Sequence, residues 1–187
     1  MSRAATLLVL AALAATPLFA AELVPVPAFH TLQLRGGGEI TVRPGPVQRV
    51  TLVQGSRRFT TFRMERNGRL TIDACNRQCP RNYKLRIDVQ SPNVPNVAIM
   101  GGGEIAAAAG FAPQSQLSAA IMGGGEIDLR SVAARDMSAA INGGGRIVTG
   151  RSLSLSAAVN GGGEVRYSGN PRLSTAVNGG GSVSREY

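Results

Sequence analysis

The sequence predicts an all-β protein, a right-handed parallel β-helix (β-solenoid) with coils of ~18–22 residues. Three observations predict it. The tripeptide Gly-Gly-Gly recurs, beginning at Gly36, Gly101, Gly123, Gly143, Gly161 and Gly179, and from the second copy onward the steps are 22, 20, 18 and 18 residues. Apolar and polar residues alternate with the period of two that strands have. With 24 Gly and no Trp, the core must consist of short side chains, as in slender solenoids.

The residues around each glycine turn repeat as well. Ala120-Ile121-Met122 precedes one turn and Glu126-Ile127 follows it, and the other copies keep related residues at these places. On a pleated chain one side would carry Leu117, Ala119, Ile121, Ile127 and Leu129. The same alternation returns once in every repeat of 18–22 residues. A repeat of this length fits one coil of a solenoid, stacked ~4.8 Å above the preceding coil. An antiparallel meander or propeller-like sheet is the competing architecture.

Residues 21–98 are expected to form an N-terminal β section that caps the regular coils of residues 99–187, within one structural domain. Apolar runs predict strands over 29–35, 39–43, 47–53, 59–65, 70–74 and 83–89. Asn67-Gly68, between two of these runs, predicts a hairpin. A solenoid ends in an open β edge, and a hairpin-rich cap would protect it from edge-to-edge association.

Residues 1–20 have the organisation of a secretory signal peptide. Arg3 precedes an apolar stretch over 7–13, and small residues over 17–21 form a cleavage zone. The apolar stretch is shorter than the ~20 residues that span a bilayer, and no other apolar run in the sequence is long enough to span one. We therefore expect an exported protein, periplasmic or extracellular, with no transmembrane segment after cleavage.

The two cysteines, Cys75 and Cys79, lie in a polar loop that ends at Pro80. In an oxidising compartment this spacing predicts a local disulfide, which should contribute ~2 kcal/mol by the chain-entropy argument. A structural zinc site needs four ligands, and the one histidine, His30, is far away in sequence. We expect neither a metal nor a cofactor.

Positive charge is concentrated in the N-terminal section. The net charge is +9, and residues 22–90 carry twelve Lys or Arg against five Asp or Glu. Such a section could contact an anionic polysaccharide or lipid head groups, whereas a bias toward Arg on solvated strand faces explains the same composition without a ligand. The candidate polyanion contacts are Arg35, Arg43, Arg49, Arg57, Arg58, Arg63, Arg66 and Arg69. No nucleic-acid partner is expected.

The glycine turns followed by an acidic and an aliphatic residue, the step near 20 residues, and Val165–Pro171 before the last turn resemble the GIN-domain family. This family is described as head domains of auto-transporter adhesins. The resemblance covers most of the chain, about residues 28–185, and implies a single-domain β-helix in or outside the bacterial envelope. It supplies no catalytic residues. The sequence departs from the family in having Gly-Gly-Gly where the family often has Gly-Ser-Gly followed by Asp.

One pair of carboxylates makes an enzyme conceivable. Glu104 and Glu126 would lie on adjacent coils ~5 Å apart, near the separation in retaining glycosidases. However, Arg146 should lie next to Glu126 on the following coil, and alternating surface charges of this kind require no catalysis.

The residues before the glycine turns offer a second surface. Asn142, Asn160 and Asn178 continue a column that begins with Met100 and Met122. Stacked amides can bond along the axis, and the alternative is a flat strip on which a ligand lies. We therefore expect a non-enzymatic structural or adhesion module. An anionic polysaccharide or lipopolysaccharide binder is the alternative, and a polysaccharide-cleaving enzyme comes third.

Overall fold

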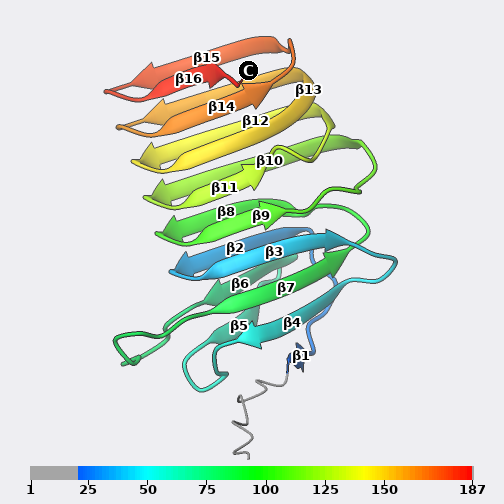
Figure 1. The fold of residues 1–187 in the computed structure, drawn as a ribbon, viewed down its shortest axis with the longest axis vertical. Coiled ribbons are helices and arrows are strands. Elements are labelled where there is room, and N and C mark those ends of the chain that lie inside the picture. Colours follow the sequence, from blue (N-terminus) through cyan, green and yellow to red (C-terminus); the bar gives the residue numbers. More distant parts are fainter. Residues whose placement is uncertain (1–20, 187) are drawn as a thin grey trace, which may run out of the picture.

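The computed structural model describes residues 21–186, and within them every regular element is a β-strand (Figure 1). The N-terminal strands are β1 (Glu22–Val24), β2 (Thr31–Gly36), β3 (Glu39–Pro44), β4 (Arg49–Gln54), β5 (Thr61–Met64), β6 (Arg69–Asp73) and β7 (Arg86–Ser91). The others are β8 (Asn96–Gly101), β9 (Glu104–Ala107), β10 (Gln114–Gly123), β11 (Glu126–Leu129), β12 (Ala134–Gly143), β13 (Arg146–Asn160), β14 (Glu164–Ser168), β15 (Arg172–Asn178) and β16 (Ser182–Arg185). The predicted all-β class is confirmed. The proposed signal peptide, residues 1–20, lies outside the described residues.

The strands hydrogen-bond into two ladders, which β13 joins because its two halves pair in different ladders (Figure 1). Ladder A has the order β1-β4-β7-β3-β9-β11-β13-β14-β16. Ladder B has the order β5-β6-β2-β8-β10-β12-β13-β15. All pairs are parallel except β1–β4, β4–β7 and β5–β6. Within residues 21–186 no helix is long and apolar enough to cross a membrane.

The sequence repeat sets the register of the parallel pairs. Ile121 of β10 lies opposite Ile99 of β8 on one side and Ile141 of β12 on the other. Gly123 likewise lies between Gly101 and Gly143. Equivalent residues of successive repeats therefore lie one above another, and the glycine turns form one continuous edge of the molecule (Figure 1).

The N-terminal strands are not stacked in chain order. The pair β2 and β3 lies inside the stack, with β6 and β7 on one side and β8 and β9 on the other. Beyond β6 and β7, the antiparallel strands β4, β1 and β5 complete this end of the molecule. The hairpin predicted at Asn67-Gly68 is confirmed, since it connects β5 to β6 and Gly68 has a φ of 69°.

The inward side chains of both ladders form one core of aliphatic residues. Ile121, Ile127 and Leu129 are at most 1% exposed, and burying each such side chain contributes roughly 1.5–3 kcal/mol. The alternation also predicts Leu153 to face inward, but this side chain is 63% exposed. It lies where β13 passes from ladder A to ladder B, so the alternation of a single straight strand does not hold there.

Candidate functional site

The acidic residues of the N-terminal section are all consumed in ion pairs. The pairs are Glu22–Arg57, Glu39–Arg86, Glu65–Arg69, Asp88–Arg43, and Asp73 with both Arg35 and Arg63. Their N–O distances run from 2.6 Å for Arg63–Asp73 to 3.6 Å for Arg69–Glu65. The excess positive charge of the section therefore resides on the cations that remain.

The eight candidate arginines do not form one surface. Five of them are in the ion pairs above, namely Arg35, Arg43, Arg57, Arg63 and Arg69. They are also divided between the ladders, because β3 and β4 belong to ladder A and β2, β5 and β6 to ladder B. Among the described residues of this section, the cations without a carboxylate partner are Arg49, Arg58, Arg66, Arg77, Arg81 and Lys84.

Four of these six cations lie on two loops that we call the basic double loop, residues 55–60 and 74–85. The two loops are fastened together by Tyr83. Its hydroxyl accepts a hydrogen bond from the Ser56 amide at 2.9 Å and shares one with the Thr60 hydroxyl at 2.6 Å. Its ring meets Phe59 edge-on, with centroids 5.5 Å apart. The Asn76 amide donates to the Phe59 carbonyl at 2.9 Å.

Further contacts hold the tip of the basic double loop. The predicted disulfide is confirmed, since Cys75 and Cys79 are bonded and close the loop around Arg77. The Arg58 guanidinium lies 5.5 Å from the centre of the Phe59 ring, a separation at which a cation is attracted by the ring face. Arg58, Arg77 and Arg81 are all exposed. These positive charges therefore lie at the surface of loops that are held by a disulfide, by hydrogen bonds and by aromatic packing.

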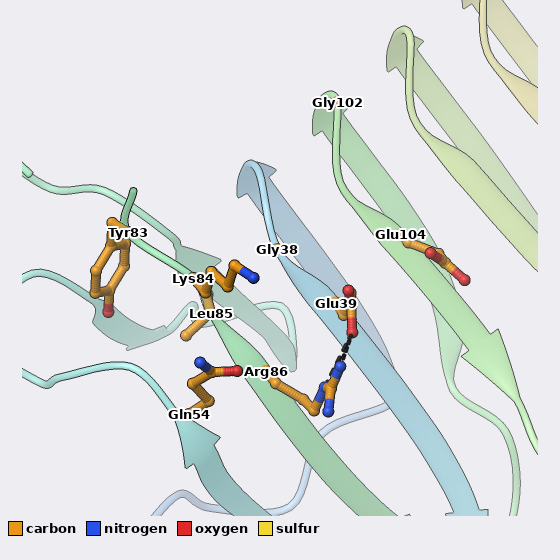
Figure 2. Close-up of a pocket in the computed structure, with 9 residues that line it drawn as sticks. All are labelled: Gly38, Glu39, Gln54, Tyr83, Lys84, Leu85, Arg86, Gly102 and Glu104. Atoms are coloured by element: carbon orange, nitrogen blue, oxygen red, sulfur yellow. Dashed lines mark hydrogen bonds and ion pairs between the residues drawn. The ribbon is translucent and has the colours of Figure 1, made fainter. Parts of the chain in front are cut away.

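A hollow of about 380 Å³ adjoins the basic double loop (Figure 2). It lies between the end of that loop and the edge of glycine turns, and it is lined by Gly38, Glu39, Gln54, Tyr83, Lys84, Leu85, Arg86, Gly102 and Glu104. Figure 2 shows the Lys84 side chain extending toward β3, whereas Arg86 is paired with Glu39 at 2.9 Å. The hollow therefore offers a free ammonium group, an amide and carboxylates to a polar ligand.

A column of glutamates runs from the hollow along ladder A. Glu39, Glu104 and Glu126 occupy directly paired positions on β3, β9 and β11. Partial burial, and then the negative charges of Glu126, Glu39 and Asp128, raise the pKa of Glu104. Arg146 lies opposite Glu126, as the sequence predicts, and on its other side opposite Glu164. Its ion pair is with Glu164 at 3.1 Å.

Glu104 and Glu164, both on ladder A, should make contributions to stability that respond oppositely to pH. Hydrogen bonds from Arg166, together with the charges of Arg166 and Arg146, lower the pKa of Glu164 against the desolvation that burial imposes. A carboxyl with a lowered pKa stabilises the fold above its unfolded-state pKa and loses this effect as pH falls through its folded-state pKa. The raised pKa of Glu104 has the opposite sign, so its favourable contribution exists at low pH and is lost as pH rises.

We therefore expect Glu104→Gln to raise the midpoint of thermal unfolding at neutral pH and Glu164→Gln to lower it. Both differences should shrink once the pH falls below the carboxyl range. Thermal unfolding of the two variants across an acid-to-neutral series checks this. A stabilising Glu164→Gln, or a destabilising Glu104→Gln, at neutral pH would contradict the assigned charge environment.

Comparison with known families confirms the resemblance inferred from the sequence. The model of the family described as "Putative auto-transporter adhesin, head GIN domain" matches residues 110–171. This range holds β10 to β14, which lie within the region of recurring glycine turns. No curated protein matches the chain.

The chain is also similar to several solved structures. A putative adhesin from Bacteroides fragilis has a TM-score of 0.54 and 18% identity, covering 89% of this chain and 96% of that one. Two proteins from Parabacteroides distasonis, a putative adhesin and a putative lipid binding protein, have TM-scores of 0.44 and 0.41 and identities of 15% and 16%, each covering 89% of this chain and 96% of theirs. At such identities the Bacteroides likeness concerns the fold alone. None of these names is that of an enzyme.

Proposed function

We infer that this chain is an exported, non-enzymatic module of the bacterial cell envelope that adheres to a partner surface. Its fold in this proposal is a right-handed parallel β-helix, with residues 21–98 as the capping section. The adhesin description of the family whose model matches residues 110–171 supports an exported or surface location. The signal-like residues 1–20 and the disulfide, which persists in oxidising compartments, support export.

The observation that carries the proposal is the outward face of ladder B, which we call the uncharged strip. Its three columns are Ser118, Ser138, Ser156 and Ser174; then Ala98, Ala120, Ala140, Ala158 and Ala176; and then Met100, Met122, Asn142, Asn160 and Asn178. Paired strands are ~4.8 Å apart, so the Ser and Ala columns repeat one group at that interval, and the third column has Met at its first two positions and Asn at the other three. Small side chains in register give a flat surface.

The uncharged strip suits contact with an extended partner. Two shallow hollows lie along it. One of about 190 Å³ lies over the Ala and Asn columns, and one of about 360 Å³ runs along the Ser column at the margin of the strip, where Asp136 and Arg172 also line it. Met122 is 55% exposed, and Asn side chains both donate and accept hydrogen bonds. A regular, uncharged and rigid strip favours adhesion through repeated weak contacts. Catalysis would not require the same side chain to recur from strand to strand.

The test is to place one large charged side chain on the strip. Ala140→Arg is expected to weaken binding of the exported, purified protein to cell-envelope preparations at least tenfold, because a guanidinium projecting from β12 holds a partner off the flat surface. Ala106→Arg, at an outward position of ladder A beside Asp128, is the matched control and should leave binding within about twofold. Surface-binding isotherms measure both. Unchanged binding by Ala140→Arg would show that the strip is not the contact surface.

A further inference from the structure

The charge of the basic double loop is mostly unneutralised, whereas in the rest of the 22–90 section every cation except Arg49 and Arg66 is in an ion pair. Every acidic residue of the 22–90 section pairs with an arginine, yet Arg58, Arg77, Arg81 and Lys84 have no carboxylate partner among the described residues. Four like charges on fastened loops repel one another and raise the local positive potential. Such an arrangement attracts anions from solution, most strongly at low ionic strength.

The hollow next to these loops supplies shape as well as charge. Lys84 lies both on the basic double loop and in the lining of the hollow. The other three cations lie on the loops beyond it. A volume of about 380 Å³ is in the range of small-ligand sites. A polymer could place one unit in the hollow while its neighbouring units meet the remaining cations.

We propose that the basic double loop and the adjoining hollow bind an acidic polysaccharide, whose carboxylate or sulfate groups are held by Arg58, Arg77, Arg81 and Lys84. Arginine binds planar oxyanions with two parallel hydrogen bonds. Gln54 and Glu39 in the hollow can bond to sugar hydroxyls. This site is distinct from the uncharged strip and rests only on the export proposed above, which would bring the protein into contact with such polymers.

Two other polyanions fit the loops less well. A membrane surface normally receives an apolar anchor beside the basic residues, but the exposed large apolar side chains among the described residues all lie outside the basic double loop. Single-stranded nucleic acid stacks its bases on free aromatic faces. Here Phe59 and Tyr83 pack against each other, and the Tyr83 hydroxyl is bonded to Ser56 and Thr60. The sugar hydroxyl groups need neither feature.

The first experiment removes the charge of the loops. Binding to alginate, which is a polyuronate, and to dextran sulfate is measured at low and moderate salt, with neutral dextran as the blank. The triple variant Arg77→Gln, Arg81→Gln, Lys84→Gln should bind at least tenfold more weakly, and the slope of log Kd against log salt should fall by roughly 3. The control carries the same loss of net charge at exposed positions elsewhere, as Arg135→Gln, Arg151→Gln, Arg185→Gln, and should change Kd by less than about threefold.

The second experiment tests the hollow. Gly102 lines it and does not have a positive φ, and a β-carbon added there would have no atom within 4 Å. Gly102→Asp should therefore fold normally and place a negative charge at the hollow, weakening binding about fivefold or more. Gly162 is the equivalent open position three turns away, so Gly162→Asp is the matched control and should bind within about twofold of the parent.

Several outcomes would overturn this site. One is an equal loss of affinity in the loop and control triple variants, since only net charge would then matter. Another is tighter binding to vesicles of phosphatidylcholine with phosphatidylglycerol, or to a single-stranded oligonucleotide, than to either polysaccharide. Loss of polysaccharide binding in Ala140→Arg with retention in the loop variant would assign the polymer to the uncharged strip. Conversely, full polysaccharide binding by Ala140→Arg, together with its loss in the loop triple variant, would support this site. That support would remain even if the strip proved not to be the contact surface for adhesion.

Discussion

Replacing Gly123 by alanine is expected to lower the free energy of unfolding by about 2–5 kcal/mol. Gly123 has a φ of 131°, a conformation that residues with a β-carbon rarely adopt. Its added β-carbon would also lie 2.6 Å from the carbonyl oxygen of Gly101 on the preceding coil. That oxygen belongs to the backbone of a packed ladder, so it cannot move away without disturbing the register.

The two following glycines provide graded controls. A β-carbon on Gly124 would have no atom within 4 Å, and this residue does not have a positive φ. Gly124→Ala should therefore be neutral within about 0.5 kcal/mol, or stabilise the fold by restricting the unfolded chain. A β-carbon on Gly125 would lie 2.6 Å from the Gly103 oxygen and 2.7 Å from Ile99 Cγ2, which predicts a loss of about 1–3 kcal/mol.

Denaturant unfolding of the three variants measures this order. The expected ranking of destabilisation is Gly123→Ala, then Gly125→Ala, then Gly124→Ala. Equal effects at all three positions would contradict the close stacking of successive turns. A large loss at Gly124 alone would mean that the middle glycine makes a structural contact that the described fold does not contain.

The parallel register of the strands from β8 onward was predictable because its signal is repeated along the sequence. From the second copy onward, each copy places Ala-Ile-Met, or a close relative, before the glycines and an aliphatic residue two positions after them. The strand phase of one repeat therefore fixes the phase of the next. Stacking in register follows, since only that arrangement brings Gly101, Gly123 and Gly143 together. The sequence did not distinguish the glycines from one another, because the distances to the neighbouring coil decide which of them tolerates a β-carbon.

The order of the N-terminal strands was not predictable in the same way. Gly36 pairs with Gly101 although a long segment separates them, and β6 and β7 add to the opposite side of β2 and β3. Parallel pairing between distant strands has no local signal in the sequence. A hairpin does have one, because turn residues such as Asn67-Gly68 lie directly between its two strands. The sequence therefore predicted the strands β2 to β7 and the hairpin, but not β1 (Glu22–Val24) or which strands are neighbours.

The same reason limits the prediction of the site. Asp73 neutralises Arg35 and Arg63 because β6 lies between β2 and β5, which the sequence did not predict. Arg77, Arg81 and Lys84 were not among the candidate contacts. A usable signal existed, since residues 74–85 contain no Asp or Glu, and cations in a segment without acids have no local partner.

Truncating one core side chain should have the other largest effect. Ile121 is 1% exposed and lies between Ile99 and Ile141 in ladder B. Ile121→Ala removes buried methyl and methylene groups and leaves a cavity, which is expected to cost about 2–5 kcal/mol. Met122 is the next residue but points outward and is 55% exposed. Met122→Ala should therefore change the free energy of unfolding by less than about 0.5 kcal/mol.

The architecture is tested by where in the fold Ile121→Ala lowers local stability, in addition to how much it lowers the free energy of unfolding. In a stack each rung contacts only its neighbours, so local stability depends on adjacent rungs. Hydrogen exchange in Ile121→Ala should accelerate most in β8, β10 and β12, and less in β6, which lies further along ladder B. Uniform acceleration throughout the chain would indicate a single cooperative unit. Comparable losses in Ile121→Ala and Met122→Ala would contradict the inward and outward alternation on which the core and the uncharged strip both depend.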